Sequence, residues 1–443
     1  MRKFSDLPIA RRSPSEAGST GELDSILKGR RNFLRRSVAM AGGAAVAAGG
    51  AARSAGAAPL AVPLTEQAMG RPIELTAYGM PSKYEAHVLR RRVDVPKQLQ
   101  NWSDWSMTPI QYQPGIITPN GLIFERHHAG TPDIDPKTHR VVIHGMVRQP
   151  LQFTIDDLVR YPSVSRFHFH ECSGNGLTDW LKPSATTVQQ THGLLSGVLW
   201  TGVLASTLID EAGMDPKAAW VLFEGADSAG HARSIPLEKV MDDAIIVYAM
   251  NGERLRPENG YPLRLVLPGW EGNTSIKWLR RIKVGDQPWH LRSETARYTD
   301  PMPEGKWRQF SMVMETKSVI TSPSGGQSLK RPGFYEVTGF AWSGSGKIRA
   351  VDVSFDGGKN WREAVVEGPV MDKSLTRFKI GWNWDGKPAV LMSRAVDNNG
   401  YVQPSVADIQ KSRAIVGFVQ HHNGIQPWAI NEKGEVRNAI GQA

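Results

Sequence analysis

The sequence predicts an α+β protein in two parts, a mixed domain followed by a β-sandwich of immunoglobulin type. Between residues 121 and 290, short β-rich runs bounded by Gly, Pro and Asp alternate with segments that are apolar at helical spacing. From about residue 307, runs of alternating polarity follow one another with turn signals between them, which is typical of a β-sandwich. A chain of 443 residues is long enough for two or three domains with cores of their own.

The mixed domain is placed at residues 58–305 and begins with an irregular segment rich in Pro, Gly and Trp. A short helix is expected to start at Asp156, and a longer one covers residues 204–212 and ends near Gly213. The strands expected in this domain are rich in apolar residues and cover 141–145, 153–155, 166–172, 220–223, 245–248 and 263–266.

The sandwich is placed at residues 306–412, and a tail of low periodicity follows at 413–443. Its expected strands alternate in polarity and cover residues 334–342, 348–355, 378–382 and 389–397. Asp356-Gly357-Gly358 is expected to form a hairpin turn, because glycine tolerates the positive φ that tight turns require.

The charge of the chain argues against a nucleic-acid-binding protein. The formal net charge is +10, but residues 1–57 alone hold ten Lys and Arg against four Asp and Glu. The rest of the chain is close to balanced, and no cluster of Lys and Arg is interleaved with aromatic residues. We therefore expect no nucleic-acid partner.

Residues 1–57 have the pattern of an export signal. Gly29-Arg30-Arg31-Asn32-Phe33-Leu34-Arg35 resembles a twin-arginine signal, a weakly apolar Ala/Gly run covers 38–52, and Ala55-Gly56-Ala57 offers a small-residue cleavage site. The apolar run is too short for a membrane span, which needs about 20 apolar residues. We expect a periplasmic protein without a membrane span; a disordered basic arm is the alternative.

Cys172 is the only cysteine of the chain. A single thiol excludes an intrachain disulfide, a four-cysteine iron–sulfur cluster and a c-type haem, which needs two cysteines for its attachment. No haem is therefore expected on this chain.

The surroundings of Cys172 leave three interpretations open. On a strand, His168, His170 and Cys172 would point to the same face, where they could bind zinc or copper. The thiol could also be a buried structural cysteine, or a nucleophile or cofactor ligand. The turn Ser173-Gly174-Asn175-Gly176 favours a ligand, because its backbone N–H groups can approach an anionic or bulky group closely.

An ordered set of short motifs spans residues 120–400. The motifs are Phe124-Glu125-Arg126-His127-His128, Cys172-Ser173-Gly174-Asn175, Trp200-Thr201-Gly202-Val203-Leu204, Phe223-Glu224-Gly225-Ala226-Asp227, Asn251-Gly252-Glu253-Arg254-Leu255, Gly260-Tyr261-Pro262-Leu263-Arg264, Lys277-Trp278-Leu279 and Val353-Ser354-Phe355-Asp356-Gly357-Gly358-Lys359-Asn360-Trp361. Together they resemble the sulfite oxidase family of molybdopterin enzymes. The resemblance implies a molybdopterin domain followed by an immunoglobulin-like dimerisation domain, with molybdenum-molybdopterin as the cofactor.

The resemblance assigns roles to individual residues. Cys172 would be the single protein ligand of molybdenum, Arg126 would bind the substrate anion, and Tyr298 stands where the family has its active-site tyrosine. Further residues would contact the cofactor: His128, Asp227 and Asn259 at the pterin, Arg264 and Lys277 at the phosphate, and the turn residues Ser173, Gly174 and Asn175. Without the resemblance, Arg264 could be a surface charge and Asp227 a turn residue.

Four positions depart from the family pattern. Gly176 and Leu177 replace basic residues that help to bind sulfite, Gln190 replaces an aromatic residue, and Asn259 replaces a histidine. We expect a pocket that is less cationic and more open than one for free sulfite. The segment 288–300 resembles the molybdenum subunit of sulfane dehydrogenase within this family.

The resemblance implies a periplasmic enzyme that oxidises sulfane sulfur on a carrier protein during thiosulfate oxidation. Its electrons would pass to a separate c-type cytochrome, and the chain would form a homodimer through its C-terminal domain or a heterotetramer with the cytochrome. The alternatives are a sulfite dehydrogenase or a sulfoxide reductase on the same cofactor, a secreted zinc- or copper-binding protein, and an adhesion module.

Overall fold

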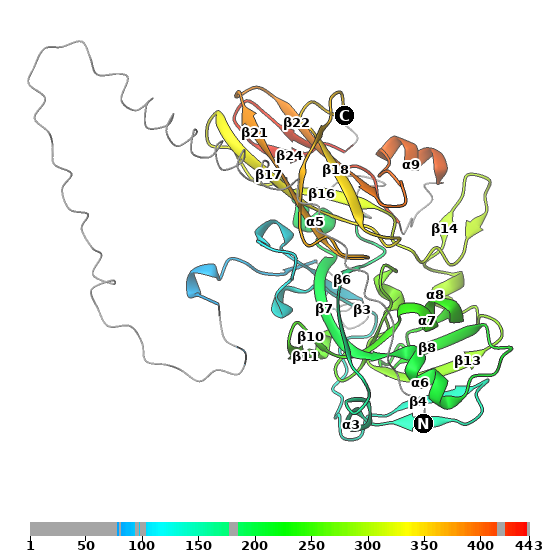
Figure 1. The fold of residues 1–443 in the computed structure, drawn as a ribbon. Helices are drawn as coiled ribbons and strands as arrows, with labels where there is room; N and C mark the ends of the chain where they lie inside the picture. Colours follow the sequence, from blue (N-terminus) through cyan, green and yellow to red (C-terminus); the bar gives the residue numbers. More distant parts are fainter. Residues whose placement is uncertain are drawn as a thin grey trace, which may run out of the picture. The chain divides into compact units, whose positions relative to one another are not determined.

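The computed structural model describes Tyr78 and residues 81–93, 97, 103–176, 185–413 and 421–440 (Figure 1). The predicted export signal and Leu177 lie outside the described residues. From Pro81 onward the chain forms one compact unit. Among the described residues, no helix combines the length and the apolar character that crossing a bilayer requires.

The strand that leads to Cys172 belongs to a five-stranded antiparallel sheet with the order β11-β10-β7-β6, in which β12 also pairs with β10. Its strands are β6 Val164–Glu171, β7 Leu195–Leu204, β10 Ile245–Met250, β11 Glu253–Arg254 and β12 Arg264–Val266. The β6–β7 ladder pairs His170 with Ser196 and Glu171 with Leu195, so pairing continues to the residue before Cys172.

A second five-stranded sheet has the order β5-β4-β13-β8-β9, with β13 and β4 parallel and the other pairs antiparallel. Its strands are β4 Val141–Gly145, β5 Leu151–Phe153, β8 Trp220–Gly225, β9 Ala232–Pro236 and β13 Leu279–Gly285. Helices α6 Ala205–Ala212 and α7 Leu237–Asp243 lie against it (Figure 1). Their apolar faces share a core with both sheets, which includes Val203, Leu208, Phe223 and Ile282.

The C-terminal part is a sandwich of two antiparallel sheets. The four-stranded sheet β16-β17-β21-β20 consists of β16 Lys317–Ser322, β17 Gly333–Trp342, β20 Val365–Glu367 and β21 Thr376–Trp384. The five-stranded sheet β19-β18-β22-β23-β24 consists of β18 Ile348–Ser354, β19 Arg362–Glu363, β22 Ala389–Asp397, β23 Trp428–Ile430 and β24 Val436–Asn438. The sandwich core takes in Phe167 and Phe169 of β6, so the two parts share buried apolar surface.

Short elements connect these sheets. They are η1 Lys83–Glu85, β1 Arg91–Arg92, β2 Asp104–Met107, η3 Ile110–Tyr112, η4 Asn120–Leu122, β3 Glu125–His127, α3 Ile155–Leu158, α5 Val188–His192, η5 Pro257–Asn259, η6 Gly272–Thr274, α8 Arg292–Thr295, β14 Asp300–Pro301, β15 Trp307–Arg308 and α9 Val406–Ser412.

The predicted α+β class with a following sandwich is confirmed, and the differences are local. Ile155 was expected in a strand but begins α3, because Thr154 and Asp157 form a capping box. The turn at Gly357 and Gly358, with φ of 76° and 89°, connects β18 to β19 as predicted. Strands β23 and β24 come from the segment expected to be a tail; each is only three residues long, too short for alternating polarity to reveal.

A substitution at Gly202 of β7 tests the close contact between the backbones of β7 and β10. A Cβ at this position would lie 2.1 Å from the carbonyl oxygen of Ile246, so Gly202→Ala must displace backbone. We expect it to lower the free energy of unfolding by about 1–3 kcal/mol, measured as the shift of the urea midpoint. Gly115→Ala is the control, because nothing lies within 4 Å of its added Cβ. Equal midpoints for the two variants would contradict the contact.

Candidate functional site

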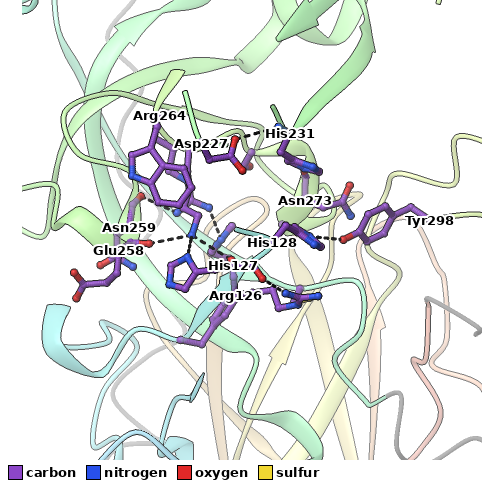
Figure 2. A pocket seen from close by; sticks show the side chains of 17 residues that line it. Arg126, His127, His128, Asp227, His231, Glu258, Asn259, Arg264, Asn273 and Tyr298 are labelled. Carbon is purple, nitrogen blue, oxygen red and sulfur yellow. Dashed lines mark hydrogen bonds between the residues drawn. The ribbon is translucent and has the colours of Figure 1, made fainter. Parts of the chain in front are cut away.

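A cavity of about 70 Å³ brings together residues from separate motifs (Figure 2). The sequence-predicted residues that line it are Arg126, His128, Cys172, Asp227, Asn259, Arg264, Lys277 and Tyr298. They come from β3, the end of β6, the loop after β8, η5, β12, the segment before β13 and the loop after α8.

Cys172 follows β6 at the start of a tight turn. Its backbone N–H donates to the carbonyl oxygen of Leu194 at 3.0 Å, and its own carbonyl accepts from the N–H of Asn175 at 2.9 Å. Burial raises the pKa of the Cys172 thiol, while the backbone N–H of Gly174 acts in the opposite direction. The thiol is therefore protonated at neutral pH until an electrophile such as a metal ion displaces the proton.

Ser173, Gly174 and Asn175 do not line the cavity, although the sequence analysis assigned them to the cofactor. The Asn175 amide instead fixes the turn: its Nδ2 donates to Oε1 of Glu171 at 2.9 Å, and its Oδ1 accepts from the N–H of Leu194 at 3.1 Å. Cofactor contacts by these three residues stay predictions.

Arg264 is a buried cation with no carboxylate partner among the described residues. Its guanidinium donates to the Asn259 carbonyl oxygen at 3.1 Å and to Nε2 of His170 at 2.6 Å, and it lies 5.3 Å from the centre of the Trp200 ring. Its Nε has no hydrogen-bond partner. Burial lowers the pKa of Arg264 to about 9.

Lys277 is a second cation of the cavity; it is half-buried and forms no ion pair with a carboxylate among the described residues. Its Nζ donates to the carbonyl oxygens of Arg126 and Glu258, at 3.1 and 3.0 Å, and to Nδ1 of His127 at 2.8 Å. Burial lowers the pKa of Lys277 well below its ordinary value, and the neighbouring Arg264 lowers it further.

These residues fit the predicted cofactor. Arg264 and Lys277 form no ion pair with a carboxylate among the described residues, so they offer positive charge that an anion such as a phosphate can neutralise. Among the residues that the structure describes, none donates to the buried Oδ1 of Asn259, which can therefore accept from a pterin N–H. Cys172 offers a sulfur ligand on another wall of the same cavity.

Tyr298 and His128 point toward one another across the cavity (Figure 2), with the Tyr298 hydroxyl 3.1 Å from Nε2 of His128. Burial lowers the pKa of His128 to about 3, and Arg126 contributes to the lowering. Burial also raises the pKa of Tyr298 to about 12. The hydroxyl is therefore protonated and the His128 ring neutral at pH 7, so Nε2 of His128 can accept a hydrogen bond from the hydroxyl.

Arg126 is placed by a ring and a carbonyl. Its guanidinium lies 5.3 Å from the centre of the Trp105 ring, and its Nη1 donates to the carbonyl oxygen of His127. The side chain lines the same cavity as Cys172 and Tyr298, so it brings positive charge to their side of the site.

The sequence analysis missed His231 and Asn273, which also line the cavity. The His231 ring stacks on that of His128 at 5.3 Å, and its Nε2 lies 2.9 Å from the Asn273 carbonyl oxygen. The Asn273 side chain donates to Oγ of Ser173 at 3.3 Å. Gly272 and Asn273 are residue types typical of turns, but nothing in the sequence places such a turn beside Cys172.

A buried ion cluster lies behind Asn273. Oε1 of Glu271 is 2.5 Å from Nε2 of His421, and its Oε2 is 3.8 Å from Nη1 of Arg233. Arg233 also lies 3.8 Å from Glu294, so two carboxylates neutralise it. Burial opposes protonation of His421, but the carboxylates of Glu271 and Asp300 outweigh burial and raise its pKa.

Two further side chains do not line the cavity. His168 is buried, and its Nδ1 contacts the carbonyl oxygen of Lys373 at 3.3 Å. Gln190 closes the capping box of α5, and the expectation of a more open pocket stays a prediction. Among the described residues, no group of three or more His, Cys, Asp and Glu side chains is arranged to bind a metal ion, so the zinc or copper interpretation gains no support.

Two family models match the chain. An oxidoreductase molybdopterin binding domain matches residues 128–292, and a Mo-co oxidoreductase dimerisation domain matches residues 308–426. Mitochondrial sulfite oxidase of Mus musculus is 31% identical over 341 residues, covering 70% of this chain and 62% of the relative. The chain thus spans less than two thirds of that curated relative.

Among solved structures, the sulfane dehydrogenase SoxCD from Paracoccus pantotrophus is similar with a TM-score of 0.82 and 42% identity. That match covers 85% of this chain and 97% of the other. NADH nitrate reductase of Solanum lycopersicum is 31% identical over 314 residues, covering 61% of this chain and 33% of the relative.

The substitution Arg264→Met tests whether the positive charge of Arg264 serves to bind the cofactor and not to stabilise the fold. In the cofactor-free protein, Arg264→Met removes a buried cation that no carboxylate among the described residues pairs with. We therefore expect its free energy of unfolding to equal that of the wild type or to exceed it by about 1 kcal/mol. The same variant should lose its cofactor during purification, measured as pterin per chain. Arg281→Met is the control, because Arg281 pairs with Glu224 at the surface and should keep the cofactor. A marked loss of stability in cofactor-free Arg264→Met would contradict the hypothesis that Arg264 serves cofactor binding and not the fold.

The raised pKa of His421 predicts that the stability of the folded protein depends on pH. Because its folded pKa is raised, its contribution to stability is complete below the unfolded value near 6.5 and is lost as the pH rises through the folded pKa. The melting temperature of His421→Gln should therefore fall below that of the wild type at pH 6, with a smaller difference at pH 9. His139→Gln should show the opposite trend, because burial lowers the pKa of His139. A difference that does not change with pH would refute the pairing with Glu271.

Proposed function

Because the chain belongs to the sulfite oxidase family of molybdopterin oxidoreductases, we propose that it oxidises sulfane sulfur carried on a partner protein during thiosulfate oxidation. The likeness to the SoxCD structure, at 42% identity over 97% of that chain, is the observation that carries this choice within the family. We further propose that it works in the periplasm and passes its electrons to a c-type cytochrome.

The cofactor, when bound, supplies two-electron redox chemistry at sulfur that side chains do not perform. Cys172 would hold the metal, Arg264 and Lys277 the phosphate, and His128, Asp227 and Asn259 the pterin. Each of these residues lines the cavity. The buried positions of Arg264 and Asn259 also keep water away from the cofactor contacts.

Arg126 and Tyr298 act on the substrate side. Oxidation of sulfur develops negative charge on oxygen, which the Arg126 guanidinium stabilises and the Tyr298 hydroxyl orients by hydrogen bonding. The neutral His128 ring accepts a hydrogen bond from the Tyr298 hydroxyl at 3.1 Å and so orients that hydroxyl.

The charge of the cavity supports a substrate other than free sulfite. Arg233, near Tyr298, is already neutralised by Glu271 and Glu294, and Gly176 supplies no side chain where the family has a basic residue. Fewer unpaired cations weaken the attraction for a small dianion and suit a sulfur atom that a protein partner delivers.

The assembly is part of the proposal. A single cysteine prevents covalent haem attachment to this chain, so the acceptor would be a separate cytochrome. The dimerisation-domain match at residues 308–426 favours a homodimer, or a heterotetramer once two cytochrome subunits join.

A sulfite dehydrogenase is the second candidate. The 31% identity to mitochondrial sulfite oxidase and the presence of Arg126 on the cavity wall favour it. A reaction at free sulfite would need only the cavity and no docking surface for a carrier.

The test compares two substrates and one variant. With a c-type cytochrome as acceptor, we expect kcat/KM to be at least about tenfold higher for a carrier protein bearing a cysteine persulfide than for sulfite. The purified protein should contain about one molybdenum per chain, and Cys172→Ser should stay folded with less than about a hundredth of the activity.

Each other outcome has a clear meaning. Turnover of sulfite without turnover of the persulfide would support the second candidate. Zinc or copper without molybdenum, or full activity of Cys172→Ser, would overturn the assignment of Cys172.

A further inference from the structure

Side chains of the C-terminal sandwich form hydrogen bonds with the turn that carries Cys172. Glu171 precedes Cys172 and is fully buried, with a relative exposure of 0%. Its Oε2 accepts from Nε1 of Trp342 at 2.6 Å, and its Oε1 accepts from Nζ of Lys317 at 3.2 Å. Lys317 and Trp342 face each other on neighbouring sandwich strands, β16 and β17.

The same lysine also holds the other end of the turn. Nζ of Lys317 donates to the carbonyl oxygen of Asn175 at 2.9 Å, and the Asn175 amide donates back to Oε1 of Glu171 at 2.9 Å. Residues 171 and 175 are thereby fixed to one point of the sandwich. Cys172 lies between them, so its backbone has little freedom to shift independently of the sandwich.

Burial makes these contacts specific. Glu171, Lys317 and Trp342 have relative exposures of 0, 1 and 0%. Charge-assisted hydrogen bonds in such surroundings are short and directional. A buried ion pair contributes little net stability compared with a well-packed apolar pair, but it selects one arrangement of the groups that form it. Here the selected arrangement includes the backbone on both sides of the thiol.

We propose that Lys317 and Trp342 are positioning residues for Cys172, through which the sandwich sets the geometry of the sulfur ligand. The inference rests on the proposed function, in which Cys172 binds molybdenum. The sandwich then has a task at the active site in addition to dimerisation. Glu171 transmits this effect, because its carboxylate joins both sandwich residues to the turn.

The chain offers a matched pair of tryptophans for the test. Trp342 and Trp428 are both fully buried in the sandwich core, and each indole N–H donates one hydrogen bond. The acceptor is Glu171 for Trp342, whereas for Trp428 it is the carbonyl oxygen of Ile320 at 3.1 Å. Replacing either by phenylalanine removes one donor and leaves a similar cavity, but only Trp342→Phe disturbs the Cys172 turn.

We expect both variants of the complete, cofactor-loaded enzyme to lose stability to a similar extent. Trp342→Phe alone should shift the absorption band of the thiolate–molybdenum bond and change the reduction potential. Its kcat should fall about tenfold with an unchanged KM, as for other outer partners of metal ligands. Molybdenum content per chain, measured on the same samples, normalises each spectrum.

A double substitution removes the ion pair without leaving a buried charge. Lys317→Met alone would strand the Glu171 carboxylate and could unfold the protein, so Glu171→Gln is combined with it. We expect the double variant to fold and to shift the band and the potential as Trp342→Phe does.

The outcomes separate the two proposals. If the wild-type enzyme contains molybdenum and both Trp342→Phe and the double variant match Trp428→Phe in spectrum and potential, the positioning role is refuted and the proposed function stands. A wild-type enzyme without molybdenum would overturn both.

Discussion

Strand β6 serves two cores at once, and the site depends on this arrangement. Side chains alternate along a strand, so Phe167, Phe169 and Glu171 face the sandwich, while His170 lines the cavity. The ladder with β7 keeps the register along the whole of β6. A slip of one residue would exchange the two faces and move the thiol out of the cavity. Packing of the phenylalanines thus fixes the position of the residue that would bind the metal.

The cavity carries a charge pattern that folding alone does not favour. Buried Arg264 and half-buried Lys277 have carbonyl oxygens and imidazoles as partners, whereas Arg233 is neutralised by carboxylates. The same residue type therefore has two roles within one site. Arg233, which is paired with carboxylates, is part of the structure that supports the cavity. Arg264, which has no carboxylate partner among the described residues, is available for an anionic ligand.

Local motifs predicted the fold class and named residues that the structure gathers around one cavity. Cys172, Asp227 and Arg264 stand in short patterns, and such patterns keep their local geometry wherever they occur. The contact between Glu271 and His421 joins residues far apart in sequence, and neither residue stands in a motif. The capping box that Gln190 forms with Thr187 was not anticipated, because the sequence did not reveal that a helix begins at Val188. Long-range pairs and caps arise from packing, which motif order does not describe.

The unpaired cations also bear on how the chain assembles. Closing the cavity around Arg264 and Lys277 brings like charges together in surroundings of low polarity, so closure is least favourable before an anion arrives. An anion bound at Arg264 and Lys277 would supply the counterion that the described residues do not provide, so binding is expected to stabilise the folded chain.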